Sequence, residues 1–378
     1  MNDNFCPAPW ISMYYHLNSA AVCCVSEDKF NMSPKQFLSS DYLQDIKNQF
    51  LKGERPDNCS ICFKLKDQNQ FNVRQSYLNS YPSIDLFQRK IKHIELRLSN
   101  LCNFKCRICF PDSSSEIEKE YAKYNSEEYN KSDFIDITND NFNELKEYCL
   151  GLDQLWITGG EPMITKQCYD LLDYLIEHKA NERISLILFT NCSVINPSML
   201  RKLLKFPKLH LYLSIDGIKG VAEYQRHGTK WSIVEQNIRK YLTIPSIKIT
   251  LRMALSAYTV LDISNFVKFI IDLSKINKEL MASSIAVVAP EALNYLNLNI
   301  DLRNRAVKEL SEAIDMLDNR FKMLKDELNT VRLNIIEQPI KDYELFKSYT
   351  NMMDNRRNES FESIFGYSLN KKDLINDK

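Results

Sequence analysis

Three cysteines lie close together in the stretch CNFKCRIC, at Cys102, Cys106 and Cys109. Deprotonated cysteines are typical ligands of zinc and of iron–sulfur clusters. A structural zinc site normally takes four protein ligands, yet no histidine or fourth cysteine lies near this triplet. Three thiolates on a four-iron cluster would leave one iron open to an exogenous ligand. The spacing therefore favours a cluster with an open coordination site.

A second group of cysteines lies near the N-terminus. It comprises Cys6, the pair Cys23 and Cys24, and Cys59 and Cys62, which have C-x2-C spacing. The first residues contain no basic region followed by an apolar stretch, so we expect no signal peptide and a cytoplasmic, reducing environment. Metal or cluster ligation is then a better use of these cysteines than disulfide formation. The isolated cysteines are expected to be small buried side chains: Cys149, Cys168 and Cys192.

A pair of glycines follows an apolar run that ends in Trp-Ile-Thr. The chain has only 8 glycines, and Gly159 and Gly160 stand together before Glu161 and Pro162. A glycine pair after a strand lets the backbone approach a ligand closely, because no Cβ intrudes. The alternative is a tight turn between strand and helix, capped by Glu161 and Pro162. Either way, the backbone geometry at this turn matters.

Short apolar runs alternate with longer amphipathic runs through the centre of the chain. This pattern predicts parallel strands joined by helices in right-handed crossovers. Such a sheet is either open and doubly wound or closed into a full or partial barrel, and its ligands gather at the C-terminal ends of the strands. The expected strands are His93–Leu98, Gln154–Thr158, Ser185–Thr190, Leu209–Ile215, Ile247–Leu255 and Ser284–Val288. The expected helices are Asn141–Leu150, Lys166–His178, Ser198–Lys205, Trp231–Leu242 and Leu261–Lys278.

The two flanks of this core differ from it in composition. The N-terminal flank is rich in cysteine and aromatic residues and has one helical pattern, at Tyr42–Leu51. On the C-terminal side, amphipathic spacing predicts a single long helix over Asp301–Leu328, followed by a polar tail from Ile340. We therefore expect three parts. They are an N-terminal region at 1–90, a core at 91–295 and a C-terminal helical extension at 296–378.

The triplet after the first expected strand and the GGEP turn after the second resemble the radical S-adenosylmethionine (SAM) superfamily, over residues 90–290. The resemblance implies an α/β fold, a partial (β/α)6 barrel, in which Cys102, Cys106 and Cys109 hold a [4Fe-4S] cluster. SAM would bind the fourth iron through its amino and carboxylate groups. An electron given to that cluster would cleave SAM to methionine and a 5'-deoxyadenosyl radical. The radical would then abstract a hydrogen atom from a substrate C–H bond.

The resemblance also implies which residues contact SAM. Glu161 and nearby backbone groups would hold its ammonium group, and Arg226 would pair with its carboxylate unless it has a surface or structural role. Ile108 stands where the family usually has an aromatic residue, so only its backbone would meet the adenine. Cys192 stands where glycine is common after Asn191, which puts the local turn in doubt. The expected contacts are Ile108, Thr158, Gly159, Gly160, Glu161, Pro162, Thr190, Asn191, Ser214, Asp216 and Arg226.

The N-terminal cysteines resemble the auxiliary-cluster module called twitch, the shortened relative of SPASM. The resemblance implies a second, closed [4Fe-4S] site with four ligands: Cys6, one of Cys23 and Cys24, Cys59 and Cys62. We favour Cys23 over Cys24, without a physical reason to exclude Cys24. In this superfamily the module commonly follows the barrel, whereas here it precedes it. A zinc site and unliganded buried cysteines are the alternatives. The tail segment Tyr349–Arg357 is weakly similar to chains with the same early cysteines.

These features lead to an enzyme of the oxidoreductase type as the expected function. The resemblance to twitch and SPASM chains implies a ribosomal peptide that undergoes oxidative tailoring as the first substrate class. It implies a sugar or nucleotide-linked small molecule that is dehydrogenated or epimerised as the second. A flavodoxin or ferredoxin would supply electrons. From other classes, a non-catalytic iron–sulfur electron carrier stays open, and a nucleic-acid modifying enzyme is disfavoured by balanced charge, with 49 basic and 49 acidic residues. No apolar run is long enough to predict a membrane span.

Overall fold

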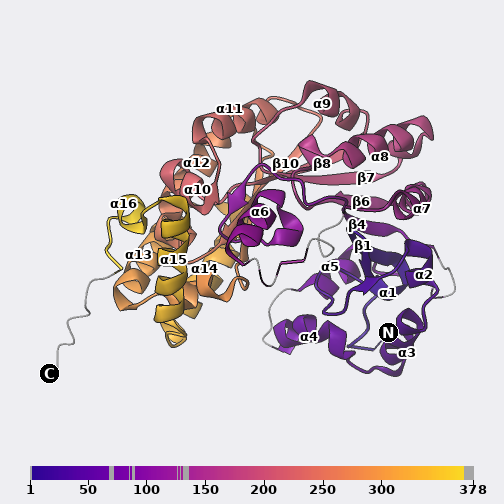
Figure 1. The fold of residues 1–378 in the computed structure, drawn as a ribbon, viewed down its shortest axis with the longest axis horizontal. Coiled ribbons are helices and arrows are strands. Elements are labelled where there is room, and N and C mark those ends of the chain that lie inside the picture. Colours follow the sequence, from indigo (N-terminus) through magenta and orange to yellow (C-terminus); the bar gives the residue numbers. More distant parts are fainter. Residues whose placement is uncertain are drawn as a thin grey trace. The chain divides into compact units, whose positions relative to one another are not determined.

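The computed structural model describes residues 2–67, 72–84, 86, 90–125, 127, 129–130 and 136–369. The chain forms two compact units, and each is built from separate stretches of sequence (Figure 1). The first unit consists of Met1–Cys102, Pro111–Thr190 and Ile195–His210. The second consists of Asn103–Phe110, Asn191–Val194 and Leu211–Lys378. The three predicted parts, with boundaries after residues 90 and 295, do not coincide with these units and stay a prediction.

The first unit contains a mostly parallel sheet with the strand order β7-β6-β4-β1-β2-β3. Strands β1, β4, β6 and β7 run parallel, while β2 and β3 continue the sheet in antiparallel pairs. The strands are β1 (Ser12–His16), β2 (Ser19–Ala21), β3 (Phe30–Asn31), β4 (His93–Arg97), β6 (Gln154–Ile157) and β7 (Ser185–Thr190). The expected strands at 93, 154 and 185 are thus present.

Strand β1 was not expected from the sequence. Its residues pair with β4 in the register Tyr14 opposite Glu95 and His16 opposite Arg97. All of β1 is buried, so its side chains alternate in direction without alternating between apolar and polar types, and the sequence carries no period-two signal. The N-terminal region therefore contributes a strand to the parallel sheet.

Helices of the first unit follow strands or connect the N-terminal elements. Figure 1 shows α7 and α8 alongside β6 and β7. The helices are α1 (Ala8–Ile11), α2 (Pro34–Leu38), α3 (Asp41–Lys52), α4 (Ser60–Asp67), α5 (Val73–Ser80), α6 (Ser115–Tyr124), α7 (Asn139–Cys149), α8 (Lys166–Glu177) and α9 (Pro197–Leu203). Side-chain oxygens of Ser40, Thr138 and Asn196 cap the starts of α3, α7 and α9.

The second unit combines strands with most of the C-terminal helices. Strand β8 (Lys208–Ser214) begins in the first unit and ends in the second. Strands β10 (Lys248–Leu255) and β11 (Met281–Ala286) pair in parallel, and β5 (Lys105–Cys106) pairs with β9 (Arg226–His227) antiparallel. The helices are α10 (Lys219–Gln225), α11 (Trp231–Leu242), α12 (Ile263–Leu273), α13 (Ile300–Met316), α14 (Lys322–Glu337), α15 (Tyr343–Arg357) and α16 (Phe361–Phe365).

The single long helix expected over residues 301–328 is wrong. The structure has two helices, α13 and α14, separated at residues 317–321. Leu317 is extended, and the carboxylate of Asp318 accepts a hydrogen bond from the backbone N–H of Arg320 at 2.9 Å. An aspartate that bonds to the backbone nearby offers an alternative to continuing the helix. The apolar spacing continues across the break because both helices bury one face.

The fold as a whole is α/β with a mostly parallel sheet, as expected from the alternation of strands and helices, and is consistent with a partial barrel. Among the described residues, no helix is both long and apolar enough to cross a membrane.

Candidate functional site

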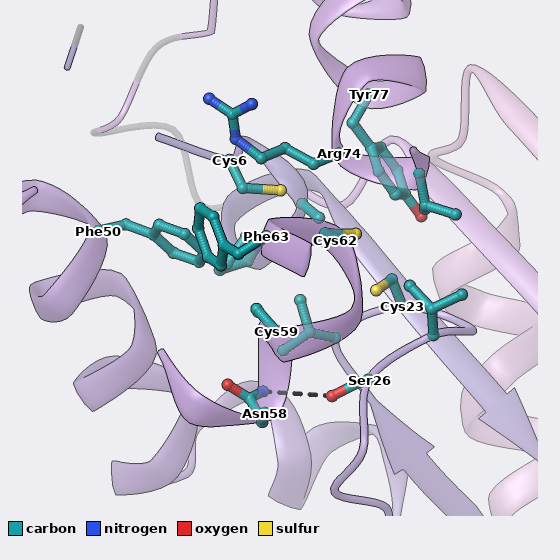
Figure 2. Close-up of a pocket in the computed structure, with 15 residues that line it drawn as sticks. Cys6, Cys23, Ser26, Phe50, Asn58, Cys59, Cys62, Phe63, Arg74 and Tyr77 are labelled. Atoms are coloured by element: carbon teal, nitrogen blue, oxygen red, sulfur yellow. Dashed lines mark hydrogen bonds between the residues drawn. The ribbon is translucent and has the colours of Figure 1, made fainter. Parts of the chain in front are cut away.

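Four of the five N-terminal cysteines line one pocket in the first unit (Figure 2). They are Cys6, Cys23, Cys59 and Cys62. Apolar and aromatic side chains, among them Phe50, Phe63 and Tyr77, line the rest of the pocket. Thus residues that are far apart in the sequence converge on one small, thiol-lined space.

Each cysteine of this pocket comes from a different local structure. Cys6 precedes α1, and Cys23 follows β2 after the hairpin formed by β1 and β2. Cys59 ends a short 3-10 helix, and Cys62 lies one turn later in α4. The C-x2-C spacing therefore places two thiols on one helical turn, while the hairpin brings Cys23 to them.

Backbone N–H groups point at three of the four sulfur atoms. The amides of Ala8 and Val25 donate hydrogen bonds to Cys6 and Cys23, respectively. The amides at the start of α5, of Val73 and Arg74, donate to Cys62. Such donors stabilise thiolates, and hydrogen bonds to sulfur are a usual feature of iron–sulfur sites. The donor set thus fits a cluster with four cysteine ligands.

The protonation of these thiols follows from their burial when no metal is bound. Burial raises the pKa of Cys6 to about 12, and the nearby Cys62 adds to the increase. Burial also raises the pKa of Cys59 to about 12 and holds that of Cys23 well above its usual range. A bound metal would reverse this, because metal ligation requires the thiolate form.

Two polar side chains tie the walls of the pocket together. The Nε atom of Arg74 donates to the carbonyl oxygen of Phe5 at 2.8 Å, next to Cys6. The Nδ2 atom of Asn58 donates to Ser26 Oγ at 3.2 Å, which joins the loop after Cys23 to the residue before Cys59. Figure 2 shows both side chains at the edge of the cysteine group. These hydrogen bonds hold the loops that carry the thiols.

Cys24 is directed away from the pocket. Its thiol hydrogen-bonds to the carboxylate of Glu95 on β4, and it does not line the four-cysteine pocket. Glu95 is buried, and burial raises the pKa of its carboxyl group. The chain bends at Cys23 and turns at Cys24 after β2 ends, so the two neighbouring side chains face different surroundings. The geometry therefore favours Cys23 over Cys24 as the fourth ligand.

The GGEP turn follows β6 and has the left-handed backbone that glycine permits. Gly159 and Gly160 have φ values of +74° and +50°. A Cβ on Gly159 would lie 2.8 Å from the side chain of Arg97, and one on Gly160 would overlap the carbonyl oxygen of Leu101. Both residues must therefore be glycine for the turn to pack against the segment that leads into the cysteine triplet.

Glu161 is almost completely buried, and much of its hydrogen-bonding capacity is used within the protein. Its Oε1 atom accepts hydrogen bonds from Thr190 Oγ1 at 2.8 Å and from the backbone N–H of Met163 at 3.0 Å. Its own N–H donates to the carbonyl of Leu101 at 2.7 Å. Glu161 thus links the segment that follows β6 to the end of β7 and caps the turn. This agrees with the alternative given above, a tight turn between strand and helix capped by Glu161 and Pro162. Its contact with SAM stays a prediction.

The cysteine triplet spans both units of the chain. Cys102 is buried in the first unit, where its N–H donates to Ser115 Oγ at the start of α6, at 3.2 Å. Cys106 and Cys109 belong to the second unit, where the N–H of Cys109 donates to the carbonyl of Cys106 at 3.1 Å. Cys106 lies in β5, opposite Arg226 in β9. Ile108, between Cys106 and Cys109 in the sequence, is partly exposed.

Arg226 contacts both a carboxylate and a cysteine within the second unit. Its Nε atom lies 2.7 Å from Asp216 Oδ2, and its Nη1 atom lies 3.9 Å from Cys106 Sγ. The Oδ1 atom of Asp216 accepts from the backbone N–H of Ala254 at 2.7 Å. Asp216 is therefore held by β10 and in turn orients Arg226. The predicted pairing of Arg226 with the SAM carboxylate has not been tested by these contacts.

The remaining expected SAM contacts lie at strand ends. Thr158 Oγ1 is 3.4 Å from Glu95 Oε1, and Ser214 ends β8. Asn191 Nδ2 donates to Asn103 Oδ1 at 3.0 Å. Cys192 has a φ of +60°, the left-handed conformation that glycine adopts easily. Cys192 therefore adopts the backbone conformation expected for the glycine that is common at this position in the family.

Several buried or partly buried polar residues were missed by the sequence analysis. Arg107, between two cysteines of the triplet, pairs with Asp354 and Glu359 of the C-terminal segment. Glu95, which is buried, and Arg97, which is partly exposed, are two positions apart in β4 and so lie on the same side of the strand, beside the turn and Cys24. The one sequence signal that could have identified Arg107 as functionally relevant is its position, as a charged residue between two cysteines of the motif. The partners could not be identified because they are distant in the sequence.

Within the described ranges, no group of three or more His, Cys, Asp or Glu side chains is arranged to hold a single metal ion. The four cysteines of the pocket offer sulfur ligands, which suit both zinc and iron–sulfur clusters. A four-iron cluster contains iron and sulfide, whereas a zinc site contains neither. Elemental analysis therefore decides between the two.

Comparison with known families identifies the region that carries the GGEP turn and the triplet. Residues 96–270, somewhat less than half of the chain, match the family described as the Radical SAM superfamily. This match supports membership of that superfamily. It covers the last two residues of β4 and all of β6, β7, β8 and β10. Expected SAM contacts follow or end β6, β7 and β8.

Curated proteins with similar sequences include enzymes named GTP 3',8-cyclase. That of Helicobacter pylori (strain HPAG1) is 27% identical over 140 residues, which are 36% of this chain and 38% of the relative. That of Pasteurella multocida is 26% identical over 111 residues, 29% of each chain. That of Psychromonas ingrahamii is 34% identical over 84 residues, 22% of this chain and 21% of the relative. The alignments thus span about a fifth to two-fifths of these relatives.

The comparison with solved structures matches two proteins described as bound to a peptide. Native anSMEcpe with bound AdoMet and Kp18Cys peptide has a TM-score of 0.40 and 20% identity, over 59% of each chain. SuiB of Streptococcus suis bound to the precursor peptide SuiA has a TM-score of 0.39 and 16% identity, over 82% of this chain and 64% of SuiB.

Proposed function

We propose that this protein is a radical SAM enzyme that uses a SAM-binding [4Fe-4S] cluster and an auxiliary cluster to modify a substrate C–H bond. One observation carries the proposal. Within the region matched by the superfamily, the GGEP turn packs against Leu101, the residue before Cys102, so the turn expected to bind SAM lies beside the start of the triplet. The four-cysteine pocket supports the second cluster.

The chain's own residues would provide binding and orientation. When bound, the SAM-ligating cluster supplies the electron for homolytic cleavage of SAM. Cys102, Cys106 and Cys109 would hold that cluster, and Arg226 would donate an N–H toward Cys106 Sγ. The Gly159–Gly160 backbone would approach the ammonium group of SAM, because no Cβ blocks it. Glu161 would fix this backbone through its buried hydrogen bonds.

The auxiliary site would involve Cys6, Cys23, Cys59 and Cys62. Because all four ligands come from the protein, it would be closed to SAM and suited to accept an electron from the substrate. An oxidative outcome, such as dehydrogenation or cross-linking, then follows. The amides near Cys6, Cys23 and Cys62 would stabilise its thiolates.

A ribosomal peptide is our first proposed substrate class, from the resemblance to twitch and SPASM enzymes. Relatives named GTP 3',8-cyclase support a nucleotide-linked small molecule as the second. A flavodoxin or ferredoxin would donate the electron. A non-catalytic electron carrier is less well supported, because such a protein does not need a glycine turn beside its cysteine motif.

A SAM cleavage assay tests this proposal. The reconstituted protein with dithionite and SAM should produce 5'-deoxyadenosine, and the true substrate should increase its yield. Cys106→Ala should abolish cleavage, whereas Cys149→Ala, which replaces a buried cysteine outside both groups, should leave it unchanged. Failure of the fully reconstituted protein to bind SAM would instead favour the electron carrier. Normal cleavage by Cys106→Ala would refute the assignment of the triplet.

A further inference from the structure

A buried arginine lies between two cysteines of the triplet. Arg107 has no exposed surface, although a guanidinium group is costly to bury without charged partners. Its Nη2 atom lies 2.6 Å from Asp354 Oδ1 and 2.5 Å from Glu359 Oε2. Asp354 is 247 residues further along the chain, in α15. The cysteine motif and the C-terminal segment are therefore joined within the second unit by ion pairs between a buried arginine and two partly exposed carboxylates.

Other contacts fix the direction of the Arg107 side chain. The guanidinium carbon lies 3.7 Å from the centre of the Tyr224 ring, and Nε donates to the Tyr224 carbonyl at 3.1 Å. The hydroxyl of Tyr224 in turn donates to Asp354 Oδ1 at 2.7 Å. Stacking, backbone and carboxylate contacts together leave this side chain little freedom.

The C-terminal segment also holds the backbone of the cysteine loop. The hydroxyl of Tyr349 donates to the carbonyl of Arg107 at 2.6 Å, and Arg357 Nη1 donates to the carbonyl of Lys105 at 2.7 Å. Glu359 Oε1 lies 2.6 Å from Nδ1 of His227, the residue paired with Lys105 between β5 and β9. Side-chain and main-chain contacts thus reach the same short loop from one segment.

We propose that residues 343–365 act as a clamp that positions the cysteine loop, residues 105–109. Asp354 and Glu359 are positioning residues that act through Arg107. The loop carries two of the three thiols expected to bind the first cluster, so its backbone sets their directions. The inference rests on the proposed function, because it concerns how the loop holds that cluster.

Two variants separate positioning from a general contribution to stability. Asp354→Asn leaves Arg107 buried with one carboxylate fewer, which should lower both stability and cluster binding. The double variant Arg107→Met with Asp354→Leu removes both charges and fills their space with apolar atoms, which commonly restores stability. In that variant Glu359 retains His227 as a partner. It therefore removes the Arg107–Asp354 ion pair of the clamp, while the main-chain contacts from Tyr349 and Arg357 remain.

The measurements are thermal unfolding of the full chain without metal, iron per chain after reconstitution, and the SAM-induced change in the EPR spectrum of the reduced protein. The double variant should unfold near the wild-type temperature. Its SAM-induced EPR change should be lost or require roughly tenfold more SAM, as is typical for substitutions behind metal ligands. The EPR signal of the auxiliary cluster, which lies in the first unit, should not change.

The control is Asp318→Asn, which removes the partner of the exposed Arg320, an ion pair of 2.9 Å in the same unit. It should leave all three measurements unchanged. If the double variant regains both stability and the SAM-induced EPR change, the network is only structural and the clamp is refuted. If the wild-type protein itself takes up no SAM-responsive cluster, the proposed function fails and the clamp fails with it.

Discussion

Neighbouring cysteines at positions 23 and 24 have different roles in this structure. Cys23 lines the four-cysteine pocket, and Cys24 bonds to Glu95. Cys23→Ser should therefore lose the auxiliary cluster, about four irons per chain, whereas Cys24→Ser should keep it. Iron analysis after reconstitution measures this difference. Equal iron loss in both variants would contradict the assignment.

A single glycine hydrogen is expected to matter at position 160. Gly160→Ala would force a side chain into the Leu101 carbonyl, in addition to the cost of about 1 kcal/mol for a left-handed alanine. Gly366→Ala is the matched control, because its φ is also positive, at +64°, and no atom lies within 4 Å of an added Cβ. Thermal unfolding without metal should show a clearly larger loss for Gly160→Ala, which should also weaken SAM binding. Equal losses would mean that the contact with Leu101 is unimportant.

At the scale of elements, strands β4 and β6 share a buried histidine contact. His93 Nδ1 lies 3.0 Å from Gln154 Oε1, and burial lowers the pKa of His93 from 6.5 to about 4. Below pH 6.5 the unfolded chain therefore takes up a proton that the folded chain does not. Stability should fall as the pH decreases from 6.5 toward 4, with a loss of roughly 2 kcal/mol between pH 7 and pH 5 from this residue.

Chemical denaturation at both pH values measures this effect. His93→Asn can keep a hydrogen bond to Gln154 but cannot titrate, so its free energy of unfolding should depend less on pH than that of the wild type. Identical pH dependence in the two proteins would show that His93 is not protonated on unfolding in this range.

For the whole molecule, iron and sulfide analysis should give about eight irons per chain and no zinc, because two [4Fe-4S] clusters are proposed. Cys59→Ala should retain about four irons and the cleavage of SAM but lose product formation, since only the auxiliary site is removed. About four irons in the wild type would refute the second cluster. Zinc in place of the second set would support the zinc alternative.

Motifs that are short in sequence could be predicted before the structure was known. The spacing of Cys102, Cys106 and Cys109 and the GGEP turn carry their chemistry locally, because neighbouring residues stay close in any fold. Strands β4, β6 and β7 were also predicted, since each is an apolar run bounded by polar residues. The superfamily match over residues 96–270 agrees with this interpretation.

Long-range packing determined the rest. The choice of Cys23 over Cys24 depends on which way each side chain points after the β1–β2 hairpin, and either cysteine satisfies the sequence pattern. Strand β1 has no alternating signal because it is buried on both faces. The pairing of Arg107 with Asp354 crosses most of the chain, and nothing local identifies the partner. Residue types and spacing therefore determined the chemistry available, whereas only the tertiary structure decided which side chains meet, because burial and contacts between distant segments arise from the complete fold.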